Sequence, residues 1–166
     1  MSIILNVRGP NGSGKSTLVR RLLGPEPLSV AYHETKVTYS RDRRVAALGH
    51  YLTPTGGCDG ISQQDTICKL VAALAPHHET VIFEGVIVST LFGRYRDLDH
   101  YLTALGHTYV WLFLDYDRAE CLRRIYARNG GKPIKEYKID EKINCVESCK
   151  RRALEAGLFV LPSYRP

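Results

Sequence analysis

The sequence predicts an α/β domain in which a five-stranded parallel sheet lies between two layers of helices. Two observations predict this class. Short runs of apolar and β-branched residues alternate along the chain with longer helical patterns. The 166 residues are enough to bury one core, and neither an internal repeat nor a low-complexity linker divides them. Because strand–helix alternation is typical of parallel sheets covered on both faces, we expect one three-layer domain over residues 1–166.

Five apolar runs are predicted as strands, at residues 2–7, 28–33, 80–84, 107–114 and 158–161. The fourth, HTYVWLFL, is the most apolar and is expected to be buried. Helical patterns predict helices at residues 16–23, 42–51, 62–75, 92–105, 117–129 and 140–156. Ser62 and Asp117 are the expected N-caps of two of them. Gly and Pro residues stop the helices at 23 and 129.

Residues 9–17 read GPNGSGKST and contain the pattern G-x-x-x-x-G-K-S between the first strand and the first helix. Glycines let the backbone amides turn inward, and the helix adds its positive N-terminus. Lys15 supplies a charge for the outer phosphates, and Ser16 supplies a hydroxyl for Mg²⁺. We therefore expect a nucleoside triphosphate to bind with Mg²⁺ on this loop, formed by Gly9, Pro10, Asn11, Gly12, Ser13, Gly14, Lys15, Ser16 and Thr17.

Two predicted strands end in carboxylates, Glu84 and Asp115. Gly85 leaves open space after Glu84, at the strand end where ligands of such sheets bind. We therefore favour Glu84 for contact with the metal or the acceptor, and a structural role for Asp115.

The net charge of +6 is unevenly distributed along the chain. Residues 1–116 carry 11 basic and 10 acidic side chains, whereas residues 117–166 carry 12 basic and 7 acidic ones. A basic C-terminal third predicts a polyanionic partner, and two solvated helix faces are an equal alternative. No apolar run of about 18 residues predicts a membrane span. The five cysteines lack a C-x-x-C pair and are expected to be reduced thiols. We expect a cytoplasmic protein.

The segments GPNGSGKST, VIFEG and WLFLDYDRAECLRRIYARN resemble the P-loop kinase superfamily of nucleoside, nucleotide and polynucleotide kinases. The resemblance implies a P-loop kinase fold and ATP as phosphate donor, with Lys15 as a catalytic residue and Ser16 and Glu84 at Mg²⁺. It also implies a lid at about residues 123–138, in which Arg124 and Arg128 close over the transferring phosphoryl group. These arginines lie four residues apart and so on one helix face. Mobile cations that arrive on closure stabilise the transition state, although a solvated helix face remains the alternative.

The acceptor side is predicted from three further stretches. In this family the second strand commonly ends near the acceptor, which makes Glu34 a candidate base or an ordinary strand-end carboxylate. Residues 49–65 contribute Asp59, and residues 83–98 contribute Arg94. The run SRDRR contributes Arg41 and Arg43, or is the solvated start of a helix. Together with nearby tyrosines they suggest a surface suited to a nucleobase and phosphates.

These stretches are similar to those of small phage-encoded P-loop kinases, including kinases that phosphorylate hydroxymethyluracil in DNA. The resemblance implies transfer of the γ-phosphate to the hydroxymethyl group of that base, with DNA as the partner. A nucleoside monophosphate kinase or a 5′-hydroxyl polynucleotide kinase is the alternative. A P-loop ATPase or GTPase switch is disfavoured, because the chain lacks N-K-x-D and has a basic, lid-like helix.

Overall fold

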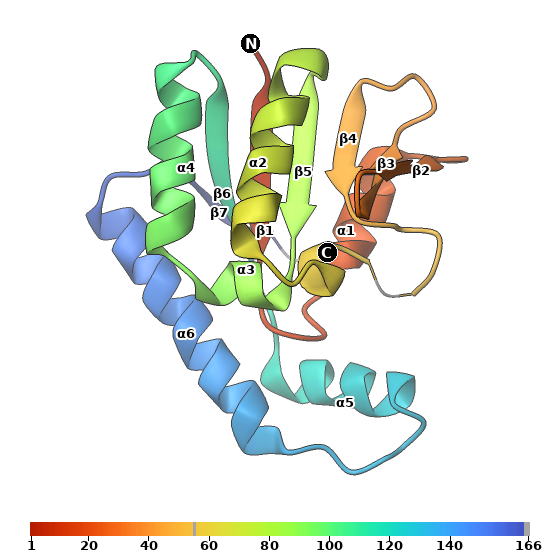
Figure 1. Ribbon diagram of the computed structural model, residues 1–166. Coiled ribbons are helices and arrows are strands. Elements are labelled where there is room, and N and C mark those ends of the chain that lie inside the picture. The colour runs from red at the N-terminus through yellow and green to blue at the C-terminus, as the bar shows by residue number, and fades with distance from the viewer. Residues whose placement is uncertain (55, 165–166) are drawn as a thin grey trace.

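The structure is a computed structural model that describes residues 1–54 and 56–164. Within these residues a single sheet has seven strands in the order β2-β3-β4-β5-β1-β6-β7, with helices on both faces (Figure 1). The strands are β1 (Ile3–Arg8), β2 (Leu28–Tyr32), β3 (Thr35–Tyr39), β4 (Val45–Leu48), β5 (Thr80–Glu84), β6 (Thr108–Leu114) and β7 (Val160–Tyr164). The α-helices are α1 (Lys15–Leu23), α2 (Gln64–Leu74), α3 (Val86–Thr90), α4 (Gly93–Ala104), α5 (Arg118–Arg128) and α6 (Glu136–Glu155). Two 3₁₀ turns, η1 (Cys58–Gly60) and η2 (Ala75–His77), flank α2.

The predicted α/β class is confirmed, and the five strands from β4 through β5, β1 and β6 to β7 are parallel. The sheet is nevertheless larger than expected, because β2 and β3 extend one edge as an antiparallel hairpin. The predicted strand at 28–33 therefore exists as β2, but at the outer edge and not in the parallel set. Residues 35–39 were not predicted as a strand.

The predicted helix at residues 42–51 is wrong. Residues 41–44 form a turn, in which the Asp42 carboxylate accepts hydrogen bonds from the Ser40 hydroxyl (2.6 Å) and the Arg44 amide (3.1 Å). The next four residues form β4, which pairs with β5. Three of them are fully buried. A four-residue apolar run is too short to show the periodicity that distinguishes a strand from a helix. Its pairing with the neighbouring strands therefore determines its conformation.

Helix boundaries agree with the predictions to within a few residues for the longer helices. Asp117 caps α5 as expected, since its carboxylate accepts the Glu120 amide at 3.0 Å. Ser62 does not cap α2, which begins after Gln63 with no side-chain cap. The short helix α3, directly after β5, was not predicted.

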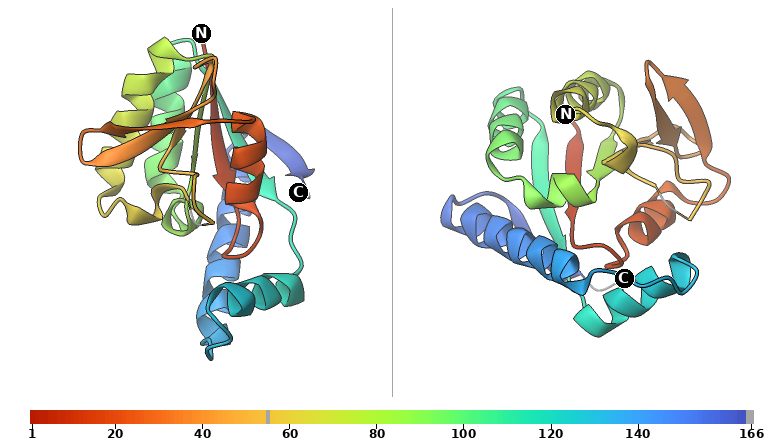
Figure 2. Two further views of the ribbon diagram at one scale, coloured as in Figure 1. Left: turned by 90° about the vertical axis from the view of Figure 1, so that its right-hand side faces the viewer. Right: turned by 60° about the horizontal axis from the view of Figure 1, so that its bottom comes forward.

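Side chains alternate between the two faces of the sheet and form two cores. On one face α1 packs over β4 and β5, in a core that includes Leu18, Val19 and Ile82 and also takes residues from β1 and β6. On the other face lie α2, α4 and α6, which cover an aromatic cluster that includes Phe83 and Trp111. The left view of Figure 2 shows from the side the helices that lie on the two faces of the sheet.

The carboxyl ends of the parallel strands form the lower edge of the sheet in Figure 1. The glycine loop follows β1 there, Glu84 ends β5, and α5 lies below this edge together with the start of α6. Within the described residues, no helix is long and apolar enough to cross a membrane.

Candidate active site

The glycine loop between β1 and α1 is shaped by left-handed backbone and by contact with α5. Gly12 and Gly14 have φ angles of 78° and 97°, which glycine adopts without strain. A Cβ atom on Gly12 would lie 2.7 Å from the Cys121 carbonyl oxygen. Gly12 is therefore required both for the turn and for the close packing of α5 on the loop.

Lys15 begins α1 and is buried, with 6% of its surface exposed. Its ammonium donates hydrogen bonds to the carbonyls of Gly9 (2.9 Å) and Pro10 (3.0 Å). Burial lowers the pKa of Lys15, while the negative charges of Glu84 and Asp59 oppose that shift. The ammonium is thus held at the loop by neutral carbonyl oxygens, which negatively charged phosphate oxygens can replace.

Glu84 is buried beside the first turn of α1, and its Oε1 accepts a 2.7 Å hydrogen bond from the Ser16 hydroxyl. Burial raises the pKa of Glu84, whereas Lys15 and the Ser16 hydrogen bond lower it. A Cβ atom on Gly57, whose φ is 84°, would lie 2.5 Å from the same Oε1. The carboxylate therefore occupies a narrow space that the backbone at Gly57 leaves open.

Asp59 lies across the sheet edge from the loop and holds the start of α3. Its Oδ1 accepts the Val86 amide at 2.7 Å. The Asp59 side chain is exposed and lines the same cleft as Lys15 and Glu84. One carboxylate oxygen is thus anchored, which orients the side chain toward the cleft.

The short helix α3 is also tied to the glycine loop. Ser89 accepts the Gly9 amide at 3.1 Å and donates to the Gly85 carbonyl at 2.6 Å. At the end of the helix, the Leu91 carbonyl accepts two hydrogen bonds from the fully buried guanidinium of Arg8, at 2.9 and 3.0 Å.

Arg8 is charged and buried at the end of β1, within an aromatic cluster. Its guanidinium carbon lies 4.1 Å from the centre of the Trp111 ring and 5.3 Å from that of Tyr95. Burial lowers the pKa of Arg8 from its ordinary value. Because Arg8 directly precedes Gly9, this packing fixes where the glycine loop leaves the sheet.

The segment between β4 and η1, described at residues 49–54 and 56–57, is held against α1 by Arg20. The guanidinium of Arg20 donates to the Tyr51 carbonyl at 3.0 Å and also to the Thr53 carbonyl. Gly57 lies at the other end of the segment, against Glu84. These described residues contribute to one wall of the cleft through Pro54 and Gly56, and we call them the 49–57 loop.

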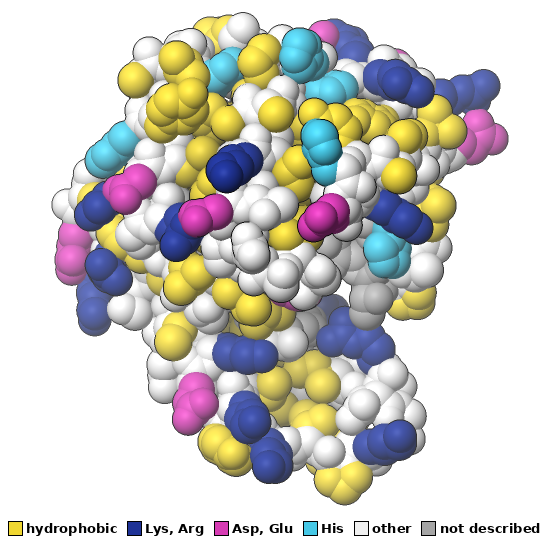
Figure 3. Space-filling view, viewed as in Figure 1, with side chains coloured by type: hydrophobic (Ala, Val, Ile, Leu, Met, Phe, Trp, Pro, Cys, Tyr) yellow, Lys and Arg dark blue, Asp and Glu magenta, His cyan; other side chains and the backbone are white. Residues whose placement is uncertain are grey.

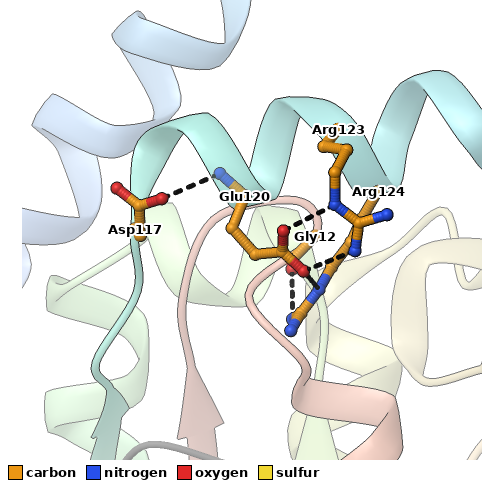
Figure 4. Close-up of polar contacts among 5 residues, drawn as sticks. All are labelled: Gly12, Asp117, Glu120, Arg123 and Arg124. Carbon is orange, nitrogen blue, oxygen red and sulfur yellow. Dashed lines mark hydrogen bonds and ion pairs between the residues drawn. The ribbon is translucent and has the colours of Figure 1, made fainter.

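Basic residues of α5 approach the glycine loop from the other side (Figure 4). Arg124 donates to the Gly12 carbonyl at 3.1 Å and to Glu120 at 2.7 Å. Glu120 also binds Arg123 at 2.7 Å, and these two partners lower its pKa to about 2. Arg128 lines the cleft and, within residues 1–54 and 56–164, has no ion-pair partner. Figure 3 shows Lys and Arg side chains gathered over this lower lobe, where α5 and α6 lie.

Several of these groups line one cleft of about 590 Å³ at the carboxyl edge of the sheet. Its wall includes most of the glycine loop and several of the predicted residues outside it: Glu84, Asp59, Arg124 and Arg128. Gly9 and Pro10 contribute backbone carbonyls that hold Lys15. Ser13 faces a smaller hollow beside Asp115 and Asp117, and its hydroxyl has no hydrogen-bond partner among the described residues.

Four other predicted residues are not brought to the cleft wall. Glu34 lies exposed in the β2–β3 turn at the outer edge of the sheet. Arg41 and Arg43 lie in the β3–β4 turn, at the amino end of the parallel strands and hence at the edge opposite the glycine loop. Arg94, on α4, pairs with Asp65 of α2.

The sequence analysis missed several residues that position or line this cleft, among them Arg8, Arg20, Arg21 and Gly57. Gly57 belongs to the pair Gly56-Gly57, in the stretch 49–65 from which the sequence analysis selects only Asp59. Arg20 and Arg21 are consecutive in the last turn of α1, where basic residues are common, so the sequence does not distinguish them from ordinary surface arginines. Arg8 ends a mostly apolar strand, and this is the one local sign that it is unusual.

Comparison with known proteins matches residues 2–163 to the family model described as "5-hmdU DNA kinase". A protein named 5-hmdU DNA kinase from Pseudomonas phage M6 is 40% identical, over 92% of this chain and 86% of the relative. One of the same name from Delftia phage PhiW-14 is 28% identical, over 98% of this chain and 68% of the relative. Among solved structures, a chain in the Pnkp1/Rnl/Hen1 RNA repair complex is similar with a TM-score of 0.58. It is 18% identical, and the match covers 91% of this chain and 46% of that one, so it supports the fold alone.

Proposed function

Since the chain belongs to the 5-hmdU DNA kinase family, we propose that it transfers the terminal phosphate of ATP to the hydroxymethyl oxygen of hydroxymethyluracil in DNA. One observation carries the proposal. Lys15, the Ser16–Glu84 pair and the carboxylate of Asp59 converge on one cleft at the carboxyl edge of the sheet. Such a cleft has groups for a polyphosphate on one side and a carboxylate for an acceptor on the other.

On the donor side, the amides of the glycine loop and Lys15 bind the phosphates of ATP. The ammonium of Lys15 exchanges its hydrogen bonds to Gly9 and Pro10 for phosphate oxygens. This exchange is favourable because a phosphate oxygen carries a negative charge opposite the ammonium, which a neutral carbonyl oxygen lacks. Buried surroundings then strengthen the attraction, since little water screens it.

The pair formed by Ser16 and Glu84 fits Mg²⁺, because the ion prefers hydroxyl, carboxylate and phosphate oxygens. When bound, the ion neutralises charge on the phosphates during transfer. The Ser16 hydroxyl and the Glu84 carboxylate would hold it. Gly57 leaves the space in which Glu84 keeps this position.

On the acceptor side, we assign to Asp59 the role of general base that the sequence suggested for Glu34. Asp59 lines the cleft, whereas Glu34 lies in the exposed β2–β3 turn. The acceptor oxygen forms a bond to the γ-phosphorus, the bond from that phosphorus to the bridging oxygen of ADP breaks, and the hydroxyl proton passes to Asp59. A target base inside a duplex has to be turned out of the stack to reach the cleft.

Arg124 and Arg128 stabilise the charge of the transferring phosphoryl group from α5. Arg124 exchanges its contacts with Glu120 and Gly12 for phosphate oxygens, and Arg128 is free of ion pairs within the described residues. Two guanidinium groups supplied from one helix face match the oxygens of that group.

The proposal is tested by following label from γ-labelled ATP into a panel of acceptors. The panel holds DNA that contains hydroxymethyluracil, unmodified DNA with a 5′-hydroxyl, and free deoxynucleoside monophosphates. Label is expected in the modified DNA alone, with Lys15→Ala as the inactive control. Label in the 5′-hydroxyl DNA or the monophosphates, with none in the modified base, would overturn the proposal.

A further inference from the structure

Arg21 of α1 lines the cleft but belongs neither to the glycine loop nor to the pair Arg124 and Arg128 on α5. Its side chain is exposed and makes no hydrogen bond or ion pair within residues 1–54 and 56–164. The other α1 arginine, Arg20, is committed to the carbonyls of the 49–57 loop. Arg21 is thus a cation held at the cleft with no anion of the chain beside it.

Position along α1 separates Arg21 from the donor phosphates. Arg21 follows Lys15 by six residues, which is about 9 Å along the helix axis. Thr17 and Arg21 share a helix face, and both line the cleft. The neighbouring Arg20 holds the 49–57 loop, and Pro54 of that loop lines the cleft as well. Arg21 therefore lies toward the end that the 49–57 loop closes, whereas Arg124 and Arg128 approach from α5.

We propose that Arg21 binds a backbone phosphate of DNA next to the nucleotide whose base enters the cleft. This inference rests on the proposed function and names a subsite of the same cleft. When a base is turned out of the stack, its flanking phosphates stay at the cleft mouth. An exposed guanidinium on a rigid helix binds such a phosphate with two parallel hydrogen bonds. The subsite distinguishes a nucleotide within DNA from a free nucleoside.

The test compares wild type with Arg21→Gln, which removes the charge and keeps a good helix former on an exposed face. Binding of a fluorescent oligonucleotide with one hydroxymethyluracil is measured by anisotropy at several salt concentrations. Loss of one phosphate contact reduces the slope of log K against log salt by about 1. Arg21→Lys is expected to keep most of the slope, because the slope depends on the number of neutralised phosphates and Lys keeps the charge, although it cannot form the two parallel hydrogen bonds. KM for ATP is expected to be unchanged in both variants.

Arg123→Gln is the matched control, because Arg123 is also an exposed arginine but is paired with Glu120 and does not line the cleft. Its salt slope should equal that of the wild type. An unchanged slope for Arg21→Gln would overturn the inference and show that Arg21 only faces solvent. A rise in KM for ATP alone would overturn it too and show that Arg21 contacts the donor nucleotide. A reduced slope without transfer to the modified base would preserve the Arg21 subsite and refute the proposed function. Transfer with an unchanged slope would do the reverse.

Discussion

The Ser16 hydroxyl donates a 2.7 Å hydrogen bond to Oε1 of Glu84 and so joins the first turn of α1 to the end of β5. Ser16 belongs to the glycine-loop motif, whereas Glu84 comes 68 residues later. The contact exists because β5 pairs with β1, which brings the two strand ends to one edge of the sheet. A hydroxyl and a carboxylate held together there are the two oxygen ligands expected for Mg²⁺.

We predict that Ser16→Ala and Glu84→Gln act on the same step. Each change should lower kcat by about 10- to 100-fold and raise the Mg²⁺ concentration needed for half-maximal rate. The double variant should lose much less than the product of the two effects, because either change alone disables one shared ion site. Steady-state kinetics over a Mg²⁺ series measure this. Fully additive effects on kcat would separate the two residues.

The pH profile of kcat/KM for ATP reports the pKa values of groups in the free enzyme. The pH range over which kcat/KM stays at its maximum should be narrower than exposed Glu and Lys side chains would give. Burial raises the pKa of Glu84 above 4.5, so the carboxylate needed for Mg²⁺ is lost early as pH falls. Burial lowers the pKa of Lys15 below 10.5, so the ammonium is lost early as pH rises. The acid limb should disappear in Glu84→Gln. A wild-type profile that stays flat past both ordinary values would contradict this reading.

Gly57→Ala should destabilise the protein and impair catalysis together. A residue with a side chain at φ 84° is strained by about 1–3 kcal/mol, and the added Cβ would also displace the Glu84 carboxylate. Urea unfolding gives the stability and the kinase assay gives kcat. Gly60→Ala is the matched control three residues away, where a Cβ would meet no described atom within 4 Å. It should change stability by less than about 0.5 kcal/mol.

The arginines of α5 should divide by position. Arg124→Ala and Arg128→Ala should each lower kcat by about 10²-fold with a smaller effect on KM for ATP, as expected for groups that act in the transition state. Arg123→Ala, one position from Arg124 and outside the cleft wall, should retain nearly full activity. Equal losses for Arg123 and Arg124 would show that the helix contributes only its overall charge.

The sequence predicted well the positions of local features, whose roles stay predictions. The glycine loop, the carboxylate that ends β5 and the basic face of α5 each lie within a few consecutive residues, and their positions follow from the motif and the element that carries them. Asp117 as N-cap was predicted correctly for the same reason, since capping depends on four neighbouring residues.

What the sequence did not predict depends on how distant strands pair. The run at 45–48 is too short for its periodicity to distinguish a strand from a helix. A helix predicted there does not show at which edge of the sheet the preceding turn, with Arg41 and Arg43, lies. In the structure this turn lies at the edge opposite the glycine loop. Glu34 lies away from the cleft wall for a similar reason, because the strand that precedes it, β2, is one arm of an antiparallel edge hairpin and is not a member of the parallel set.

The proposed transfer joins the phosphate to the hydroxymethyl oxygen of a base in DNA. To test it, modified DNA is incubated with ATP, Mg²⁺ and the protein, digested by a nuclease to nucleoside 5′-monophosphates with no phosphatase present, and analysed by mass spectrometry. We predict a new nucleotide, heavier than hydroxymethyldeoxyuridine monophosphate by one phosphate, that is absent with Asp59→Asn or Lys15→Ala. Unchanged hydroxymethyldeoxyuridine monophosphate, with the new phosphate at the 5′ end of the strand instead, would refute the proposed transfer.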